Sequence, residues 1–171
     1  MSAAAVIEGE PADLARARAA AATVCDPEIP VLSIADLGVL RDVEIRGDGR
    51  VRITITPTYS GCPAMLTIKL ELIRALAEAG FDDPLIETEL APAWSTDDLT
   101  ERGRRKLLEY GIAPPARRST SKLALFGADE VQCPRCGSAR TERVSEFGST
   151  ACKALYRCRD CAEPFDYFKC I

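Results

Sequence analysis

Two Cys-X-X-Cys pairs near the C-terminal end constrain the fold of this chain more than any other feature. Twenty-one residues separate the pairs, which are formed by Cys133, Cys136, Cys158 and Cys161. Four thiolates with this spacing close a tetrahedral metal site, and a structural zinc is the first expectation. Sulfur-only ligation also suits an iron–sulfur cluster, so zinc and iron both stay open. A domain of about 40 residues rarely folds without a metal or disulfides, and the sequence therefore predicts a zinc ribbon at residues 129–171 after a linker at residues 115–128.

The composition excludes several classes of function. The chain has 171 residues, a formal net charge of −4 and no histidine. Without histidine, Ser-His and Cys-His couples and imidazole metal ligands are excluded. No stretch reads as a signal peptide or a membrane span, so we expect a cytoplasmic protein with no membrane partner. In that reducing compartment the eight cysteines should be thiols and metal ligands. The acidic balance argues against nucleic acid as a partner.

Upstream of the linker, residues 1–114 are expected to form an α+β domain. Apolar periodicity and turn residues predict helices at 11–24, 63–79 and 97–110 and strands at 39–45, 51–56 and 85–90. This order predicts a small mixed sheet with helices packed on it. Short strands are expected in the ribbon near 141–147, 154–157 and 164–169.

A lone thiol, Cys62, lies in Tyr59-Ser60-Gly61-Cys62-Pro63, directly before the second predicted helix. Pro63 suits the first helical position, which would make Cys62 the N-cap, close to the positive end of the helix dipole. That placement favours the thiolate, which binds iron and attacks electrophiles. The competing interpretation is a small buried residue without chemistry, because free cysteine is often buried.

Two carboxylates, Asp26 and Glu28, lie on a loop that Pro27 and Pro30 stiffen. In one interpretation Asp26 caps a turn of that loop. In the other, both carboxylates sit beside Cys62 as metal ligands or partner contacts. The residues alone leave both interpretations open.

The ribbon contains two further thiols and a group of aromatic residues. Cys152 and Cys170 fall outside the tetrad, and each is either a packed thiol or part of a redox pair or second soft-metal site. The aromatic residues exceed what so small a domain is expected to bury, which predicts a docking surface. They are Tyr156, Phe165, Tyr167 and Phe168.

Several motifs resemble known families. Asp26-Pro27-Glu28-Ile29-Pro30, Asp36-Leu37-Gly38 and Thr58-Tyr59-Ser60-Gly61-Cys62-Pro63 resemble the SufT-like metal-sulfur cluster assembly domain, over about residues 10–112. Cys133-Pro134-Arg135-Cys136-Gly137-Ser138, Phe147-Gly148-Ser149-Thr150 and Glu163-Pro164-Phe165-Asp166-Tyr167-Phe168-Lys169-Cys170 resemble the PaaD family of phenylacetate degradation, accessory proteins of the phenylacetyl-CoA epoxidase. The two resemblances together cover nearly the whole chain.

The resemblance implies a non-catalytic accessory protein of aerobic phenylacetate catabolism that matures an iron–sulfur centre of the epoxidase. Its expected client is the iron–sulfur reductase component, with the di-iron site as the other candidate. Cys62 is the implied cluster-handling residue, with Asp26 and Glu28 as candidate additional ligands. One thiol cannot hold a cluster alone, so we expect a homodimer or a handover complex. The alternatives are an electron-transfer or structural component of the epoxidase, and a ribbon that contacts nucleic acid.

Overall fold

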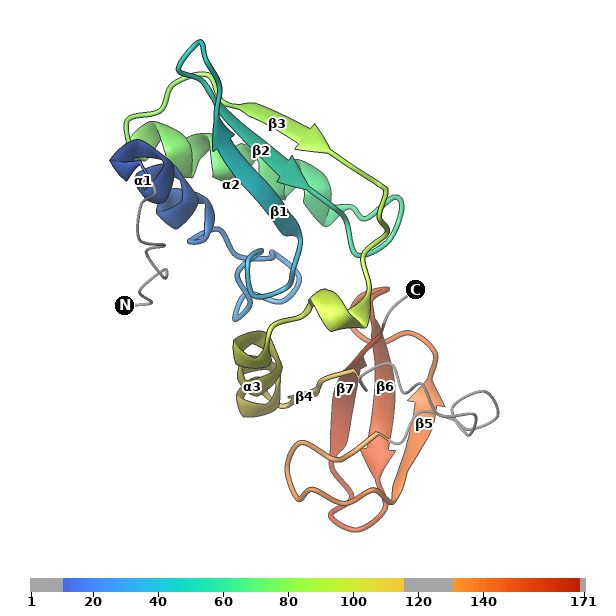
Figure 1. The fold of residues 1–171 in the computed structure, drawn as a ribbon. Helices are drawn as coiled ribbons and strands as arrows, with labels where there is room; N and C mark the ends of the chain where they lie inside the picture. The colour runs from blue at the N-terminus through green and yellow to red at the C-terminus, as the bar shows by residue number, and fades with distance from the viewer. Residues whose placement is uncertain (1–10, 116–130, 170–171) are drawn as a thin grey trace. The chain divides into compact units, whose positions relative to one another are not determined.

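A computed structural model of the chain describes residues 11–115 and 131–169 (Figure 1). Its contacts divide into two compact units, an N-terminal unit, Met1–Trp94, and a C-terminal unit, Ser95–Ile171. Within the described ranges no helix has both the length and the apolar character needed to cross a bilayer. The predicted linker, residues 115–128, lies outside the described residues from position 116 onward.

The N-terminal unit is a three-stranded sheet with two helices. Its elements in chain order are α1 (Ala12–Ala21), β1 (Leu40–Ile45), β2 (Val51–Ile55), α2 (Ala64–Glu78) and β3 (Leu85–Thr88). The strand order is β1-β2-β3, with β1 antiparallel and β3 parallel to β2. A parallel pair needs a long crossover connection, which α2 supplies. The two helices contact each other and cover one face of the sheet (Figure 1).

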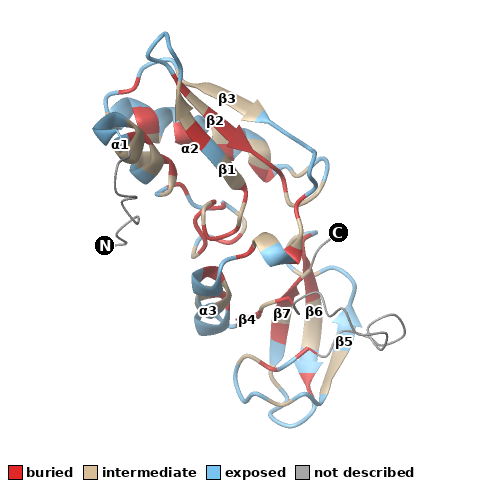
Figure 2. Ribbon diagram, viewed as in Figure 1, coloured by how far each residue is buried: buried red, intermediate tan, exposed pale blue. Residues whose placement is uncertain are grey.

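The core of this unit lies between α2 and the sheet. Ile68, Leu72 and Leu76 recur every four residues on α2 and are fully buried. They form the apolar stripe expected of a helix that packs on a sheet, and the remaining surface of α2 is largely exposed (Figure 2).

The segment between α1 and β1 belongs to the core although it contains neither a helix nor a named strand. Ile29, Leu32, Ile34 and Leu37 are buried along it. The backbone N–H of Asp26 donates to the carbonyl of Leu32 at 2.9 Å. Buried backbone groups need such partners. The packing of this segment therefore fixes the positions of Asp26 and Glu28, which lie on it.

The C-terminal unit contains η1 (Thr96–Asp98), α3 (Glu101–Tyr110) and a sheet built from β4 (Ile112–Ala113), β5 (Thr141–Ser145), β6 (Lys153–Cys158) and β7 (Pro164–Phe168). The strand order is β4-β7-β6-β5, and only β4 runs parallel to its neighbour. A cluster of buried residues connects these strands with Cys133 and Cys158 of the predicted metal site. Its members are Ala113, Val131, Cys133, Ala154, Cys158, Phe165 and Tyr167.

The predicted fold class, an α+β domain followed by a ribbon, is confirmed, with differences around the third predicted helix. That helix is split, because the capping box of Ser95 and Asp98 starts a 3₁₀ turn and Thr100 caps α3 separately. Packing also divides the chain at Trp94 rather than near residue 115. β4, which precedes the predicted linker, pairs with β7 near the C-terminus. No pattern in the linker sequence predicted this pairing.

The predicted aromatic docking surface of the ribbon is wrong. Phe165, Tyr167 and Phe168 are buried, and Tyr156 packs on two of them. The small domain buries these rings because β4 widens its sheet and Ala113 enters its core.

Substitutions on opposite faces of α2 should differ strongly in their effect on stability. Leu72→Ala removes a fully buried side chain and should lower the free energy of unfolding by about 2–5 kcal/mol. Leu70→Ala, on the exposed face, should change it by less than about 0.5 kcal/mol. Urea denaturation monitored by circular dichroism measures both values, and equal losses would contradict this packing of α2.

Candidate functional site

The four cysteines of the tetrad converge at one end of the C-terminal unit. Cys133 and Cys136 precede β5, Cys158 ends β6, and Cys161 lies in the turn before β7. The four sulfur atoms lie within 4.8 Å of one another. Cys133 Sγ is 3.7 Å from Cys161 Sγ, and Cys136 Sγ is 3.5 Å from Cys158 Sγ. A tetrahedral zinc with Zn–S bonds of about 2.3 Å requires sulfurs about 3.8 Å apart, so the arrangement fits zinc.

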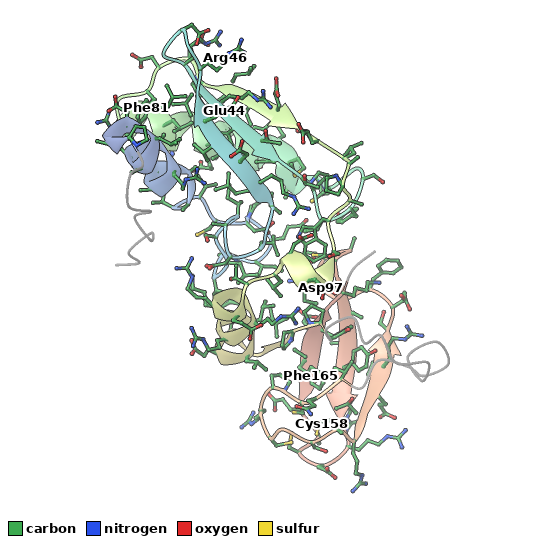
Figure 3. The ribbon with its side chains drawn as sticks, viewed as in Figure 1. Glu44, Arg46, Phe81, Asp97, Cys158 and Phe165 are labelled. Atoms are coloured by element: carbon green, nitrogen blue, oxygen red, sulfur yellow. The ribbon has the colours of Figure 1, made fainter. Side chains whose placement is uncertain are left out.

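Two similar turns hold these sulfurs. Each turn has a residue in the left-handed conformation four positions after its first cysteine, Gly137 with φ 74° and Ala162 with φ 61°. In the second turn, the backbone N–H groups of Cys161 and Asp160 hold the pKa of Cys158 down to about 7. Cys158 and Phe165, both labelled in Figure 3, belong to the same buried cluster. The ribbon core and the metal site therefore depend on each other.

Cys62 lies just before α2, but it is not the N-cap. The residue that directly precedes the hydrogen-bonded helix is Pro63, one residue later than predicted, and its backbone angles are already helical (φ −67°, ψ −22°). The Cys62 side chain is partly exposed. The backbone N–H of Ala64 and the hydroxyl of Tyr59 both hydrogen-bond to its sulfur.

The electrostatic surroundings of Cys62 oppose a bare thiolate. Burial raises the pKa of Cys62 above its usual value, and the negative charges of Glu28 and Asp26 raise it further. These effects outweigh the hydrogen bonds to the sulfur, so the pKa of Cys62 is raised, whereas the helix dipole alone predicted a lowered one. A bound soft cation would reverse the balance, because the same carboxylates would then stabilise its positive charge.

Asp26 has the first of the roles that the sequence left open, the capping of a turn, and the second role, as a ligand or partner contact beside Cys62, stays a prediction. Its Oδ1 accepts hydrogen bonds from the backbone N–H groups of Glu28, at 2.7 Å, and Ile29, at 2.9 Å. The Asp26 side chain thus caps a turn of its own loop. Its charge also acts on Cys62. However, in residues 11–115 and 131–169 the ribbon tetrad is the only group of three or more potential ligands close enough to hold a metal. Cys62, Asp26 and Glu28 therefore neighbour one another without forming a complete site.

Two residues of the N-terminal unit, Tyr59 and Cys25, had no predicted role. Tyr59 belongs to the sequence motif around Cys62, but only the fold shows its hydroxyl at the sulfur. Cys25 has an exposed thiol and lines a groove of about 400 Å³ together with Thr67, Glu71 and other residues of α2. No spacing pattern in the sequence singles out Cys25.

Of the two remaining thiols of the ribbon, the structure describes Cys152, which is not part of the tetrad. Cys152 is buried, and its sulfur lies 3.1 Å from the hydroxyl of Thr150. This placement supports the packed-thiol interpretation. Cys170 lies outside the described residues.

Two family models match the chain. Residues 117–169 match the PaaD zinc beta ribbon domain, and residues 14–81 match the iron-sulfur cluster assembly protein family. The first match covers the zinc tetrad, and the second covers Asp26, Glu28 and Cys62. The cysteine geometry and the family model thus agree on a zinc ribbon.

Some similar bacterial proteins match most of this chain, and others match only about half of it. A protein of Escherichia coli (strain K12), provisionally named as the D-type subunit of 1,2-phenylacetyl-CoA epoxidase, is 53% identical over 85% of this chain and 86% of its own length. An Fe-S protein maturation auxiliary factor of Porphyromonas gingivalis is 37% identical over 53% of this chain and 83% of its own length. The crystal structure of a domain of unknown function from Bacillus anthracis matches 56% of this chain and 92% of that chain, with a TM-score of 0.52 and 24% identity. That last likeness concerns the fold alone.

Removing one ligand of the tetrad should abolish zinc binding and unfold the ribbon. Structural zinc contributes about 10–16 kcal/mol to small domains of this kind. Cys158→Ser should therefore reduce zinc from one ion per chain to none, as measured by elemental analysis, and expose the buried rings of β7 to solvent. Cys152→Ser, at a buried thiol outside the tetrad, is the control and should keep its zinc. Full zinc content in Cys158→Ser would exclude the tetrad as the ligand set.

Replacing Glu28 should make Cys62 more reactive. Glu28→Gln removes a charge that raises the pKa of Cys62, so a larger fraction of thiolate should be present at pH 8 and iodoacetamide should react faster. The difference from wild type should vanish at high pH, where both thiols are ionised. Mass spectrometry of the Cys62 peptide gives the rates. Glu44→Gln serves as the control, because the Glu44 carboxylate on β1 pairs with Arg52 on β2, and the reaction rate of Cys62 should not change. An unchanged rate in Glu28→Gln would refute the electrostatic account.

Proposed function

The chain belongs to the PaaD family of phenylacetyl-CoA epoxidase proteins, and on this premise we propose that it delivers iron or an iron–sulfur cluster to that epoxidase complex. The N-terminal unit matches an iron–sulfur assembly family, and the ribbon matches the PaaD zinc ribbon. The proposed client is the iron–sulfur reductase component, in the cytoplasm. The protein is an accessory factor in phenylacetate catabolism and does not epoxidise substrate.

The observation that carries this proposal is the charge distribution around Cys62. Two carboxylates disfavour the free thiolate and favour a cation bound to it. When iron or a cluster binds, the sulfur–iron bond forms as the thiol proton leaves to solvent. When a client thiolate replaces Cys62 on the iron, the bond breaks and Cys62 takes up a proton again. No oxidation or reduction is needed for either step.

The incomplete ligand set suits a transient carrier. A cluster is usually held by four cysteines, whereas this unit offers one partly exposed thiol with two carboxylates nearby. Glu28 is a better candidate additional ligand than Asp26, because Asp26 Oδ1 already accepts two backbone N–H groups. The missing ligands come from a second copy of the chain or from the client.

The zinc ribbon has a structural role in this proposal. Its four thiolates form a closed tetrahedral set with no position open for a substrate, which is typical of structural zinc. The ribbon then serves to orient the client.

A second candidate function is electron transfer by an iron–sulfur centre in the ribbon. The all-sulfur ligand set favours it, because four thiolates also hold iron–sulfur clusters. Visible absorption and about stoichiometric iron in freshly purified, anaerobic protein would support this function. Colourless protein with one zinc per chain would exclude it.

Loss of the Cys62 sulfur should abolish delivery without unfolding the chain. In cells that produce the epoxidase under iron-sufficient conditions, Cys62→Ala should reduce the iron content of the reductase component to the level found without this protein. Cys25→Ala removes the other exposed thiol of the N-terminal unit and should leave client iron unchanged. Elemental analysis of the purified component measures both. Normal client iron and epoxidase activity with Cys62→Ala would refute the proposed role.

A further inference from the structure

The helix that follows Cys62 exposes a row of large apolar side chains. Leu66, Leu70 and Ile73 are 69%, 58% and 45% exposed, respectively. Their spacing of four and then three residues places them on one face of α2, opposite the buried face. Single exposed apolar residues are ordinary, but aligned ones of this size indicate a contact surface. We call Leu66, Leu70 and Ile73 the α2 stripe.

The charges that border the α2 stripe differ between its two sides. On one side, Arg74 is engaged by Glu71 and by Glu78, whose Oε1 lies 3.7 Å from Arg74 Nη1. On the other side, Lys69 is the helical neighbour of both Leu66 and Ile73. A partner therefore meets apolar side chains, one side where two carboxylates outnumber one guanidinium, and one cationic side.

We infer that the α2 stripe is the docking surface for the recipient iron–sulfur protein, a conclusion that rests on the proposed delivery function. The docked element is an amphipathic segment with apolar side chains at helical spacing and an acidic residue facing Lys69. Leu66 lies only four residues after Cys62, and the stripe extends about 10 Å along the helix. A client segment bound to the α2 stripe therefore ends close to Cys62, the thiol that releases the iron or cluster.

The size of the stripe argues for a transient client rather than a second copy. Stable interfaces bury about 800 Å² and roughly 20–30 residues on each partner, whereas the α2 stripe consists of three residues. A parallel seam between copies usually extends over three to four heptads, whereas this stripe covers two turns. A transient contact is what a carrier needs, because it must release the client after transfer.

Helix geometry gives a second argument against a copy of this chain. In an antiparallel pair centred on Leu70, each Cys62 lies eight residues, or about 12 Å, from the axis of symmetry. The two thiols would then be about 24 Å apart, too far to share a cluster. A client that carries its own cysteines completes the ligand set without this constraint.

The test measures client binding and iron transfer separately. The full-length, zinc-loaded chain is titrated with the metal-free reductase component of the epoxidase as the probe, and the dissociation constant is determined by interferometry. Leu70→Glu should weaken binding by at least about tenfold and reduce iron transfer, with zinc content and circular dichroism unchanged. Leu90→Glu is the matched control, because Leu90 is 62% exposed in the same unit but lies outside α2, and its binding should equal wild type.

The outcomes separate this inference from the proposed function. Cys62→Ala should bind the probe like wild type but transfer no iron, whereas Leu70→Glu should still accept iron but not deliver it. If Leu70→Glu binds and delivers normally, the docking surface is refuted and the role of Cys62 stands. If wild type does not bind the probe, the docking surface is refuted and the reductase component is not the client. If Leu70→Glu only converts a dimer to a monomer, the stripe is a contact between copies and the inference is wrong. If Cys62→Ala delivers normally while Leu70→Glu loses binding, the delivery function fails and the docking surface stands.

Discussion

The hydrogen bonds between the Asp26 carboxylate and the backbone of its own loop determine where charge lies in the N-terminal unit. They fix a turn whose next residues, Ile29 and Leu32, are buried in the core, so the loop cannot shift without disturbing packing. With the loop held in this way, Asp26 and Glu28 act on a sulfur more than thirty residues later in the chain. The chemistry of Cys62 thus follows from the folding of a segment that has no regular secondary structure.

The two sulfur sites of the chain illustrate opposite uses of cysteine. In the ribbon, four sulfurs surround one position and share a core with Phe165 and Tyr167, so the ion is part of the folded state. At Cys62, one sulfur lies partly exposed among carboxylates that do not complete a site. The first arrangement retains its metal, and the second suits a metal that arrives and departs. Under the proposed function, one chain thus combines a structural zinc with a metal that binds only transiently.

Local patterns predicted much of this structure, and long-range contacts explain what they missed. The tetrad, α2 and the hairpin of β1 and β2 follow from spacing and periodicity within short windows. The raised pKa of Cys62 depends on burial and on distant carboxylates, so the helix dipole alone pointed in the wrong direction. The pairing of the two-residue strand β4 with β7 depends on residues more than fifty positions apart, and no local pattern encodes it.

The position of β4 determines where the chain can be cut without dividing a sheet. Ile112 and Ala113 form an edge of the ribbon sheet, so the strand that ends at Ala113 and the strands that follow residue 130 belong to one unit. The indole of Trp94 donates to the carbonyl of Leu37 at 2.8 Å and completes the first unit. A chimera of two relatives joined after Trp94 would inherit each sheet whole. One joined near residue 115 would take its edge strand from a different parent than the strand with which it pairs.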